Sequence, residues 1–252
     1  MWQWQSFVNF FFKSSCALCQ RPVDTSICAD CWAKVSQCQI PLHQSLTIQP
    51  FGKSSVMVLA WGEYTGDLRR AIATLKYNNQ PMIGHSLGQA LGQTWNQLMK
   101  QPHHQITQLL SKRIVTPKSR LLKSQTIKSQ NIVAVPIPMH MTKLKKRGFN
   151  QAVLIADAFC RITGIPLAKH GLKRVSDTKA QFSLSIQERE QNLAGAFMPC
   201  SQWVRRSPNA SILLIDDIYT TGATVRSAAH TLQKVGCDVL GVAAIARPRI
   251  YK

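Results

Sequence analysis

The sequence has 252 residues, 45% of them hydrophobic, which is enough for one catalytic-size domain with a true core and a small appendage. Its 31 Lys and Arg residues against 11 Asp and Glu give a net charge of +20, which favours polyanionic partners such as nucleic acid or phosphorylated sugars. It has no apolar run of about 18 residues, so we expect no membrane-spanning helix. Its eight cysteines, four of them in Cys-x-x-Cys steps, suit a reducing compartment, and we predict a cytoplasmic protein. The aromatic segment 1–13 is expected to pack on the protein body, with contact to the inner face of the membrane as the alternative.

Two Cys-x-x-Cys steps lie close together near the start of the sequence, and they contain Cys16, Cys19, Cys28 and Cys31. Each step can bring two thiolates to one tetrahedral ion, so the two steps together predict a zinc site. A closed shell of four thiolates leaves no open position, and we therefore expect this Zn2+ to stabilise a module over residues 1–45 rather than to catalyse. A redox dithiol is the alternative, although it would need only one such step.

From residue 55 onward, short apolar runs alternate with amphipathic helical patterns. Strands are expected at 56–61, 132–135, 212–215 and 238–246, and helices at 65–77, 84–100, 148–161 and 224–235. This alternation is typical of an α/β fold with a mostly parallel central sheet flanked by helices, which we assign to one domain over residues 55–252. Residues 101–130 are rich in Gln, Ser, Lys and Arg, so they predict a basic solvated insertion, with contact to an anion as the alternative.

The segment Ile212–Thr224 combines an apolar strand, two acidic residues and a Thr-Thr-Gly turn. Asp216 and Asp217 would follow the strand at its carboxyl end, where ligands of open α/β sheets bind. The turn at 220–224 leads into a helix N-terminus, which can offer N–H groups and hydroxyls to a phosphate. Because two adjacent carboxylates suit the cis hydroxyls of a ribose, the segment predicts a ribose 5-phosphate site. The alternatives are a metal site at the acidic pair and a simple N-cap in the turn.

A second anion site is predicted where the strand at 132–135 ends. Two prolines and a cluster of cations follow that strand, and then Gly148 opens the next helix. A strand end, a cationic loop and a helix N-terminus together suit a bound anion such as pyrophosphate. The residues proposed for this loop are Pro138, Lys146 and Arg147.

The string Ile212–Thr224 is similar to the motif with which type I phosphoribosyltransferases bind phosphoribosyl pyrophosphate (PRPP). In that family the acidic pair holds the ribose hydroxyls, and the Thr-Gly turn holds the 5-phosphate. The resemblance implies PRPP-binding roles for Asp216, Asp217, Thr220, Thr221, Gly222, Ala223 and Thr224.

The order of the motifs along the chain resembles that of the ComF family, which includes ComFC and GntX proteins. The matching strings are VPIPMH, KRGFNQA, TGIP, LKRVSDTKAQFSLSIQEREQNLAGAF and LLIDDIYTTGATV. With the cysteine module and Tyr64-Thr-Gly…Leu75-Lys76, the resemblance runs from Cys16 to about Pro248. It implies a type I phosphoribosyltransferase fold with an N-terminal zinc finger and a link to natural competence, the uptake of single-stranded DNA during transformation. The departure is the insertion at 101–130, which is longer than expected for the family.

The resemblance also implies a mobile loop over the active site. By position, the loop would carry Arg174, Thr178, Gln181, Arg189 and Asn192. Local capping and surface charge are the alternatives for these side chains.

Two functions follow from these features. The first is a PRPP-binding protein of the ComF type, needed for uptake or handling of single-stranded DNA, with other competence proteins such as a helicase of the ComF operon as partners. The alternative is an active phosphoribosyltransferase of nucleotide or sugar-phosphate metabolism, which would use PRPP with Mg2+ and have no direct role on DNA; Arg147 and Arg189 are its catalytic candidates. Trp2, Trp4 and Trp32 could stack on bases, or they could simply pack within the cysteine module.

Overall fold

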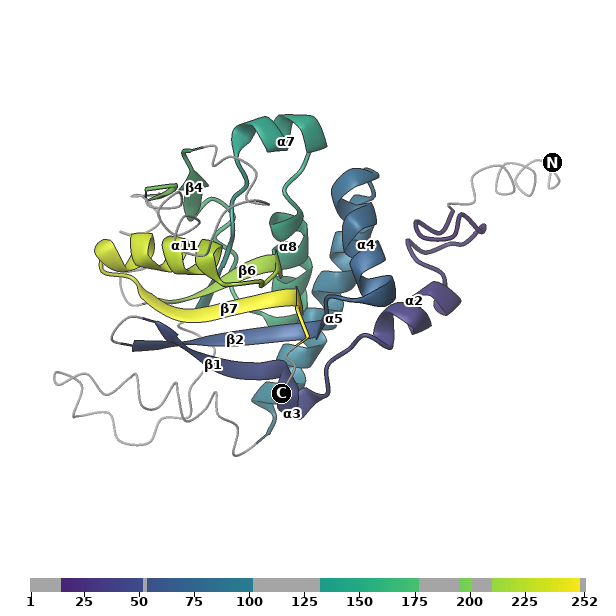
Figure 1. The fold of residues 1–252 in the computed structure, drawn as a ribbon, viewed down its shortest axis with the longest axis horizontal. Coiled ribbons are helices and arrows are strands. Elements are labelled where there is room, and N and C mark those ends of the chain that lie inside the picture. Colours follow the sequence, from purple (N-terminus) through teal and green to yellow (C-terminus); the bar gives the residue numbers. More distant parts are fainter. Residues whose placement is uncertain (1–14, 52–53, 102–131, 177–194, 201–209, 250–252) are drawn as a thin grey trace, which may run out of the picture.

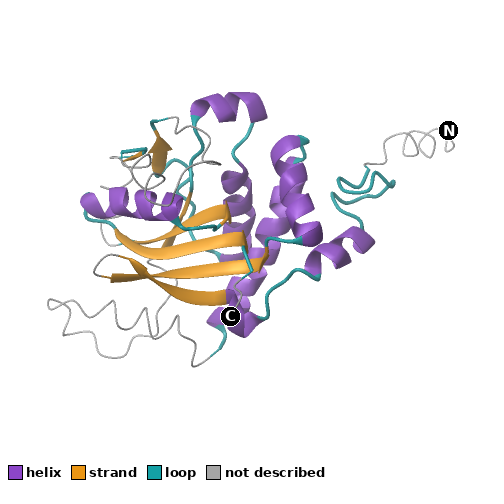
Figure 2. Cartoon of the chain, in the orientation of Figure 1, coloured by secondary structure: helices purple, strands orange, loops and turns teal. Residues whose placement is uncertain are grey.

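The computed structural model describes residues 15–51, 54–101, 132–176, 195–200 and 210–249. These residues form a mixed α/β fold with a five-stranded sheet flanked by helices, as the sequence predicted (Figures 1 and 2). The sheet order is β1-β2-β7-β6-β3, in which only the β1–β2 pair is antiparallel. The strands are β1 (Leu46–Phe51), β2 (Ser54–Glu63), β7 (Asp238–Arg247), β6 (Ser211–Ile218) and β3 (Ile132–Pro136).

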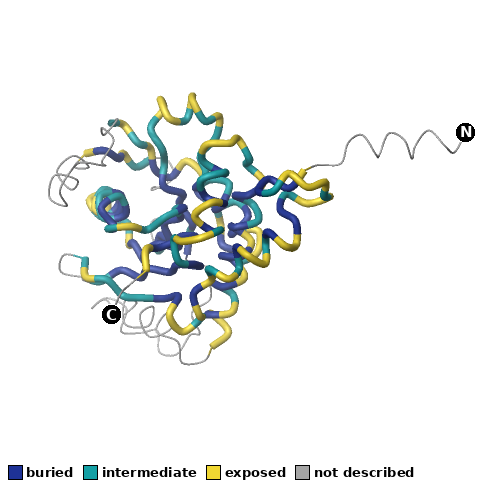
Figure 3. Tube along the Cα trace, turned by 45° about the vertical axis from the view of Figure 1, so that its right-hand side comes forward, coloured by how far each residue is buried: buried dark blue, intermediate teal, exposed yellow. Residues whose placement is uncertain are grey.

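Helices cover both faces of this sheet, and the two faces have separate buried clusters. The helices are α2 (Ala29–Ser36), α3 (Leu42–Ser45), α4 (Gly66–Tyr77), α5 (Pro81–Met99), α7 (Met141–Arg147), α8 (Gln151–Thr163) and α11 (Ala223–Lys234). One face carries α4, α5 and α8, and the other carries α11 with the small hairpin of β4 (Leu172–Arg174) and β5 (Phe197–Pro199). The sheet is therefore the central layer of three, and its strands other than β1 are mostly buried (Figure 3).

Alternation along β6 directs its side chains to the two faces in turn. Leu213 and Ile215 belong to the cluster on the α5 and α8 side, whereas Ile212 and Leu214 belong to the cluster under α11. The same period, continued beyond Ile215, sends the next two side chains to opposite faces. The two acidic residues at the end of β6 thus meet different surroundings, although they are neighbours in the sequence.

Close contact between α5 and α8 fixes the helix that follows the predicted anion loop. A Cβ added at Gly88 would lie 2.4 Å from the carbonyl oxygen of Ile155, so only glycine allows this approach. One turn further, Trp95 meets Phe159 edge to face with ring centroids 5.9 Å apart. The N-terminal end of α8 is thereby held in place at the sheet edge where β3 ends.

The chain reverses direction across the sheet between β3 and β6. After β3, α8 leads outward to a short extended segment in which Leu167 forms a parallel bridge with Ala134 of β3. After β6, α11 leads the other way, to β7. Open α/β sheets bind ligands at such a switch point, outside the carboxyl ends of the strands. The carboxyl ends of β3 and β6 lie together there, because the two strands are parallel and Pro136 is in register with Ile215.

The structure corrects three details of the sequence interpretation. The cations expected in a loop at 143–147 lie on the short helix α7, which has an N-cap at His140, and α8 begins only at Gln151. Asp216 and Asp217 lie within the last three residues of β6 rather than after it. Strand β1 was not predicted, because its alternation is broken by Pro50. The insertion at 101–130 falls almost wholly outside the described residues.

The cysteine-rich segment packs on α4 and α5. Leu18 and Val35 belong to the same buried cluster as Leu68 of α4. Ser26 and Ser86 share a hydrogen bond of 2.9 Å between their hydroxyl oxygens, which ties the segment to α5. Within the described ranges, none of the helices combines the length and the apolar character that crossing a membrane requires.

Candidate functional site

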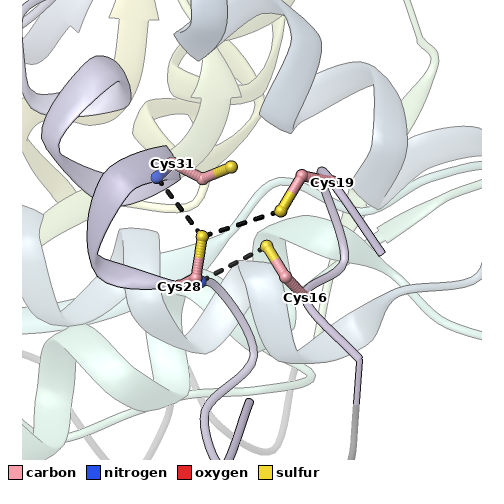
Figure 4. A group of neighbouring side chains, drawn as sticks. All are labelled: Cys16, Cys19, Cys28 and Cys31. Atoms are coloured by element: carbon pink, nitrogen blue, oxygen red, sulfur yellow. Dashed lines mark hydrogen bonds between the residues drawn. The ribbon is translucent and has the colours of Figure 1, made fainter. Parts of the chain in front are cut away.

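The four cysteines predicted to hold zinc converge on one point. Their sulfur atoms all lie within 4.8 Å of one another, and none of the four is in a disulfide (Figure 4). The Cys19 and Cys28 sulfurs are 3.7 Å apart, close to the edge of about 3.8 Å in a tetrahedron with Zn–S bonds of about 2.3 Å. The donor set and its geometry therefore fit Zn2+, and a four-thiolate shell leaves it a structural role.

Local structure brings the two halves of the cluster together. Cys28 is the N-cap of α2 and its sulfur accepts a hydrogen bond from the Cys31 backbone N–H, while its own N–H donates to the Cys16 sulfur at 3.3 Å. Arg21 donates to the Cys19 sulfur at 3.3 Å, and this interaction lowers the pKa of Cys19 to about 6. Burial, together with the neighbouring thiols, raises the pKa of Cys31 to about 12. Metal binding would therefore release at least the Cys31 proton at neutral pH.

The acidic pair at the end of β6 is held by groups from two helices. Asp217 is only 5% exposed, and its Oδ2 atom forms an ion pair with the Lys76 ammonium at the end of α4. Its Oδ1 atom accepts a long hydrogen bond of 3.5 Å from the Gln151 side-chain amide at the start of α8. Asp216 accepts a hydrogen bond of 2.8 Å from the Asp217 backbone N–H. The two carboxyl groups are thus fixed at the switch point by different partners.

These partners give the two carboxyl groups opposite tendencies. Burial and the adjacent charge of Asp217 raise the pKa of Asp216 well above its usual range. For Asp217, burial would also raise the pKa, but the ammonium of Lys76 outweighs burial and lowers it. Burial opposes the charge of Lys76 as well, yet the Asp217 carboxylate raises its pKa overall. Burial therefore disfavours the charge of Asp216, whereas the Lys76 ammonium favours the charge of Asp217 and neutralises it.

The Thr-Thr-Gly turn forms the other side of the switch point. Gly222 has φ of +77°, and a Cβ there would lie 2.5 Å from the Tyr219 hydroxyl, so this turn requires glycine. The Arg226 guanidinium donates to the Thr221 carbonyl oxygen at 2.7 Å and so braces the turn from the first turn of α11. Among the described residues, no side chain caps the start of α11, and the N–H groups at a helix N-terminus suit an anion.

The segment after β3 completes the edge. Asn150 donates from its side chain to the Ile137 carbonyl oxygen at 3.0 Å and caps α8, which fixes the turn between α7 and α8. Arg147, at the end of α7, donates to the Gln151 side-chain oxygen at 2.5 Å and lies over the Tyr77 ring, 5.7 Å from its centroid. A continuous set of contacts therefore joins the acidic pair to this guanidinium through the Gln151 amide. Lys146 is exposed on α7.

The structure thus brings most of the predicted residues to one edge of the sheet. Asp216, Asp217 and the turn at 220–224 share this edge with Arg147. Of the predicted mobile-loop residues only Arg174 is described; it lies on β4 with its guanidinium over the Phe197 ring, 5.6 Å from the centroid. The others, Thr178, Gln181, Arg189 and Asn192, lie outside the described residues, as do Trp2 and Trp4.

Three contributors to the site were missed in the sequence: Lys76, Tyr77 and Gln151. A signal for Lys76 was present, because it continues the four-residue spacing of Leu68 and Ile72, which are both fully buried on α4. A lysine on the apolar stripe of a helix predicts a buried acidic partner, because an unpaired buried charge is costly. Tyr77 and Gln151 carried no comparable signal, since their roles depend on the placement of Arg147 and Asp217.

Comparison with known proteins finds relatives that are named for competence or DNA utilization. No family model matches it. It is 26% identical to Competence protein F of Haemophilus influenzae over 235 residues, covering 92% of this chain and 90% of that protein. It is 22% identical to DNA utilization protein YhgH of Salmonella typhi, covering 92% and 89%, and 33% identical to Competence protein ComFC of Bacillus subtilis over 116 residues, or 45% and 43%. These similarities and the four-cysteine cluster support the resemblance of the chain to the ComF family.

Proposed function

We propose that this protein binds PRPP at the switch point and serves in the uptake or handling of single-stranded DNA during natural transformation. One observation supports PRPP binding. The acidic pair, the glycine-dependent turn at the start of α11 and the guanidinium of Arg147 lie together where β3 and β6 end. In this proposal, residues 1–45 form the zinc module, and residues 55–252 form the domain that carries the PRPP site.

The chemistry of the edge suits the three parts of PRPP. Asp216 and Asp217 would hydrogen-bond the ribose hydroxyls, and the turn at 220–224 would bind the 5-phosphate through backbone N–H groups and hydroxyls. Arg147, Lys146 and the chain at Pro138 would face the pyrophosphate, whose charge Mg2+ would share when it enters with the ligand. The alternative of a metal ion bound directly by the acidic pair is less favoured, since the Lys76 ammonium already neutralises Asp217.

The proposed role on DNA draws on the relatives' names and on charge. The relatives Competence protein F and DNA utilization protein YhgH are named for competence and DNA utilization. The net charge of +20 suits a polyanion, and three lysines of α7 are exposed beside the proposed PRPP site: Lys143, Lys145 and Lys146. Trp32 is less available for stacking on bases than its sequence position suggested, because it is half-buried with its ring centroid 6.1 Å from that of Trp61.

Calorimetric titration with PRPP and Mg2+ tests the ligand site. Asp217→Ala should abolish binding, because it removes an acceptor for the ribose hydroxyls and leaves Lys76 buried without its partner. Asp157→Ala is the matched control, since Asp157 lies on α8 in an exposed pair with Arg161 and should bind PRPP as the parent does. Parental affinity in Asp217→Ala would show that the loop has been assigned wrongly.

Measuring how salt affects the binding of fluorescent single-stranded DNA tests the proposed role on DNA. Replacing Lys143, Lys145 and Lys146 with Gln should weaken binding and flatten the slope of log K against log salt by about 0.7 for each lost phosphate contact. The control replaces three exposed lysines elsewhere, Lys34, Lys100 and Lys234, with Gln, so that the net charge falls equally. If both triple variants lose the same affinity, total charge rather than α7 determines DNA binding.

Catalysis by phosphoribosyl transfer is the competing function, because Arg147 is placed where it could take the charge of a leaving pyrophosphate. Pyrophosphate release from PRPP on addition of candidate acceptors would support it. A transformation assay on a strain that lacks the gene separates the two roles. Loss of transformation supports the DNA-handling role, whereas unchanged transformation would favour a metabolic enzyme.

A further inference from the structure

We propose that Lys76 is a positioning residue of the PRPP site. Lys76 acts as an internal counter-cation that holds Asp217 in place. Through Asp217 and the Gln151 amide, it also connects the ribose side of the site to Arg147 on the pyrophosphate side. This inference rests on the proposed PRPP site. It gives a role to a buried lysine that is not among the groups proposed to touch the ligand.

The position of Lys76 is built into α4. Its side chain is 19% exposed and that of Asp217 is 7% exposed, so the pair is largely removed from water. The buried stripe that contains Leu68 and Ile72 directs Lys76 toward the carboxyl end of β6. The ammonium of Lys76 forms an ion pair with Asp217 Oδ2, an atom that is shielded from water. Asp217 therefore depends on α4 for its orientation as well as for its charge.

The charge of Lys76 also determines what the site presents to an anion. The contact with Lys76 cancels the charge of Asp217 and leaves Oδ1 directed at Gln151. Asp217 can thus accept a hydrogen bond from a ribose hydroxyl without adding net negative charge near the phosphates.

The amide of Gln151 links the two halves of the site in one fixed orientation. Its nitrogen donates to Asp217 Oδ1 at 3.5 Å, and its oxygen accepts from Arg147 at 2.5 Å, so turning the amide over would break both hydrogen bonds. Tyr77, the residue after Lys76, lies under the same guanidinium. The last two residues of α4 therefore contact both the ribose side and the pyrophosphate side.

Titratable groups surround this pair from three sides. Asp216 lies beside it on β6, Tyr64 follows β2 and acts on the charge of Lys76, and Arg147 lies beyond the Gln151 amide. Without Lys76, burial would disfavour the ionised form of Asp217. Binding of PRPP should then require a higher pH, because Asp217 must lose its proton without help from a cation.

The experiment measures PRPP affinity from pH 6 to about pH 9 in the parent, Lys76→Met, Lys76→Arg and the exposed control Lys100→Met. In Lys76→Met we expect affinity to fall at least about tenfold at pH 7 and to recover in part as the pH rises, while the parent and Lys100→Met stay nearly flat. Lys76→Arg, which keeps the charge, should stay closer to the parent than Lys76→Met. A Lys76→Met variant with parental affinity at every pH overturns the proposal.

A second variant keeps the test decisive if Lys76→Met does not fold. Gln151→Met leaves the Lys76–Asp217 ion pair intact and removes both hydrogen bonds of the amide, the one to Asp217 Oδ1 and the one from Arg147. It should weaken PRPP binding while sparing ribose 5-phosphate, which lacks the pyrophosphate; equal losses for both ligands would overturn the link. If the parent protein binds no PRPP at all, the proposed function fails, whereas parental binding by the variants overturns only the role of Lys76 and Gln151.

Discussion

The cysteine cluster and the acidic edge of the sheet are built in different ways. Two Cys-x-x-Cys steps and one helix N-cap suffice to bring four sulfurs together, all within a short stretch of chain. The acidic edge draws on α4, the α7–α8 segment and β6, which are far apart in the sequence and meet only through the topology of the sheet. A metal site of the first kind can be found from spacing, whereas a site of the second kind can be found only in part.

Loss of the metal should have the largest effect. Structural zinc contributes on the order of 10 kcal/mol to folding in zinc-finger peptides. In Cys28→Ser, we expect zinc content to fall from one ion per chain to near zero and hydrogen exchange to rise over α2 and the facing turn of α4. Metal analysis and hydrogen exchange by mass spectrometry measure both. Cys200→Ser, outside the cluster, should change neither; absence of zinc from the parent purified under reducing conditions would refute the site.

The buried ion pair should have the next largest effect. Asp217→Asn leaves the Lys76 ammonium buried without its counter-charge, and we expect the free energy of unfolding to fall by about 3 kcal/mol or more. Asp157→Asn breaks an exposed pair with Arg161 on α8 and should cost no more than about 1 kcal/mol. Urea denaturation of both variants gives the comparison. Similar small losses in both would mean that Asp217 is well solvated and that the edge is more open than the structure indicates.

The turn at Gly222 should have a smaller, mainly local effect. Gly222→Ala forces a Cβ into a left-handed position against the Tyr219 hydroxyl, and should lower the free energy of unfolding by about 1 to 3 kcal/mol. Gly236→Ala is the matched control, because Gly236 also has a positive φ of +83° but has open space where the Cβ would lie. The difference between the two variants in thermal or urea unfolding isolates the steric part. A larger loss in Gly236→Ala would mean that the turn at Gly222 is free to shift.

The smallest effect concerns the pH dependence of stability. The pKa of Asp216 is raised in the folded state. The stabilising contribution of Asp216 to the free energy of unfolding is therefore fully present below the ordinary aspartate pKa of 3.8, and it is lost as the pH rises through the folded-state pKa. Asp216→Asn should therefore gain stability relative to the parent as the pH rises from 4 toward neutrality, in stability curves taken by urea denaturation at several pH values. Asp238→Asn provides the control, because Asp238 lies at the first residue of β7, at the other edge of the sheet from Asp216. If the two variants show parallel curves, Asp216 is ionised at neutral pH.

Much of the fold and part of the site could be predicted from local patterns. The four predicted strands and the helices α4, α5, α8 and α11 are present, because their apolar periodicity matches the faces that they bury. Helix α7 was missed, since none of its seven residues is buried and its basic composition reads as a loop. The β4–β5 hairpin was missed because each strand has three residues and the partner lies far along the chain.

The sequence by itself determined the zinc ligands, the α/β alternation and the motif at the end of β6. These depend on residues within a few positions of one another, so spacing and periodicity are enough to find them. Only the tertiary structure decided that Asp216 and Asp217 have different environments, that Lys76 neutralises one of them, and that Gln151 connects them to Arg147. The physical reason is that burial and charge pairing depend on which helix ends meet at the switch point, and that is determined by the order of strands in the sheet.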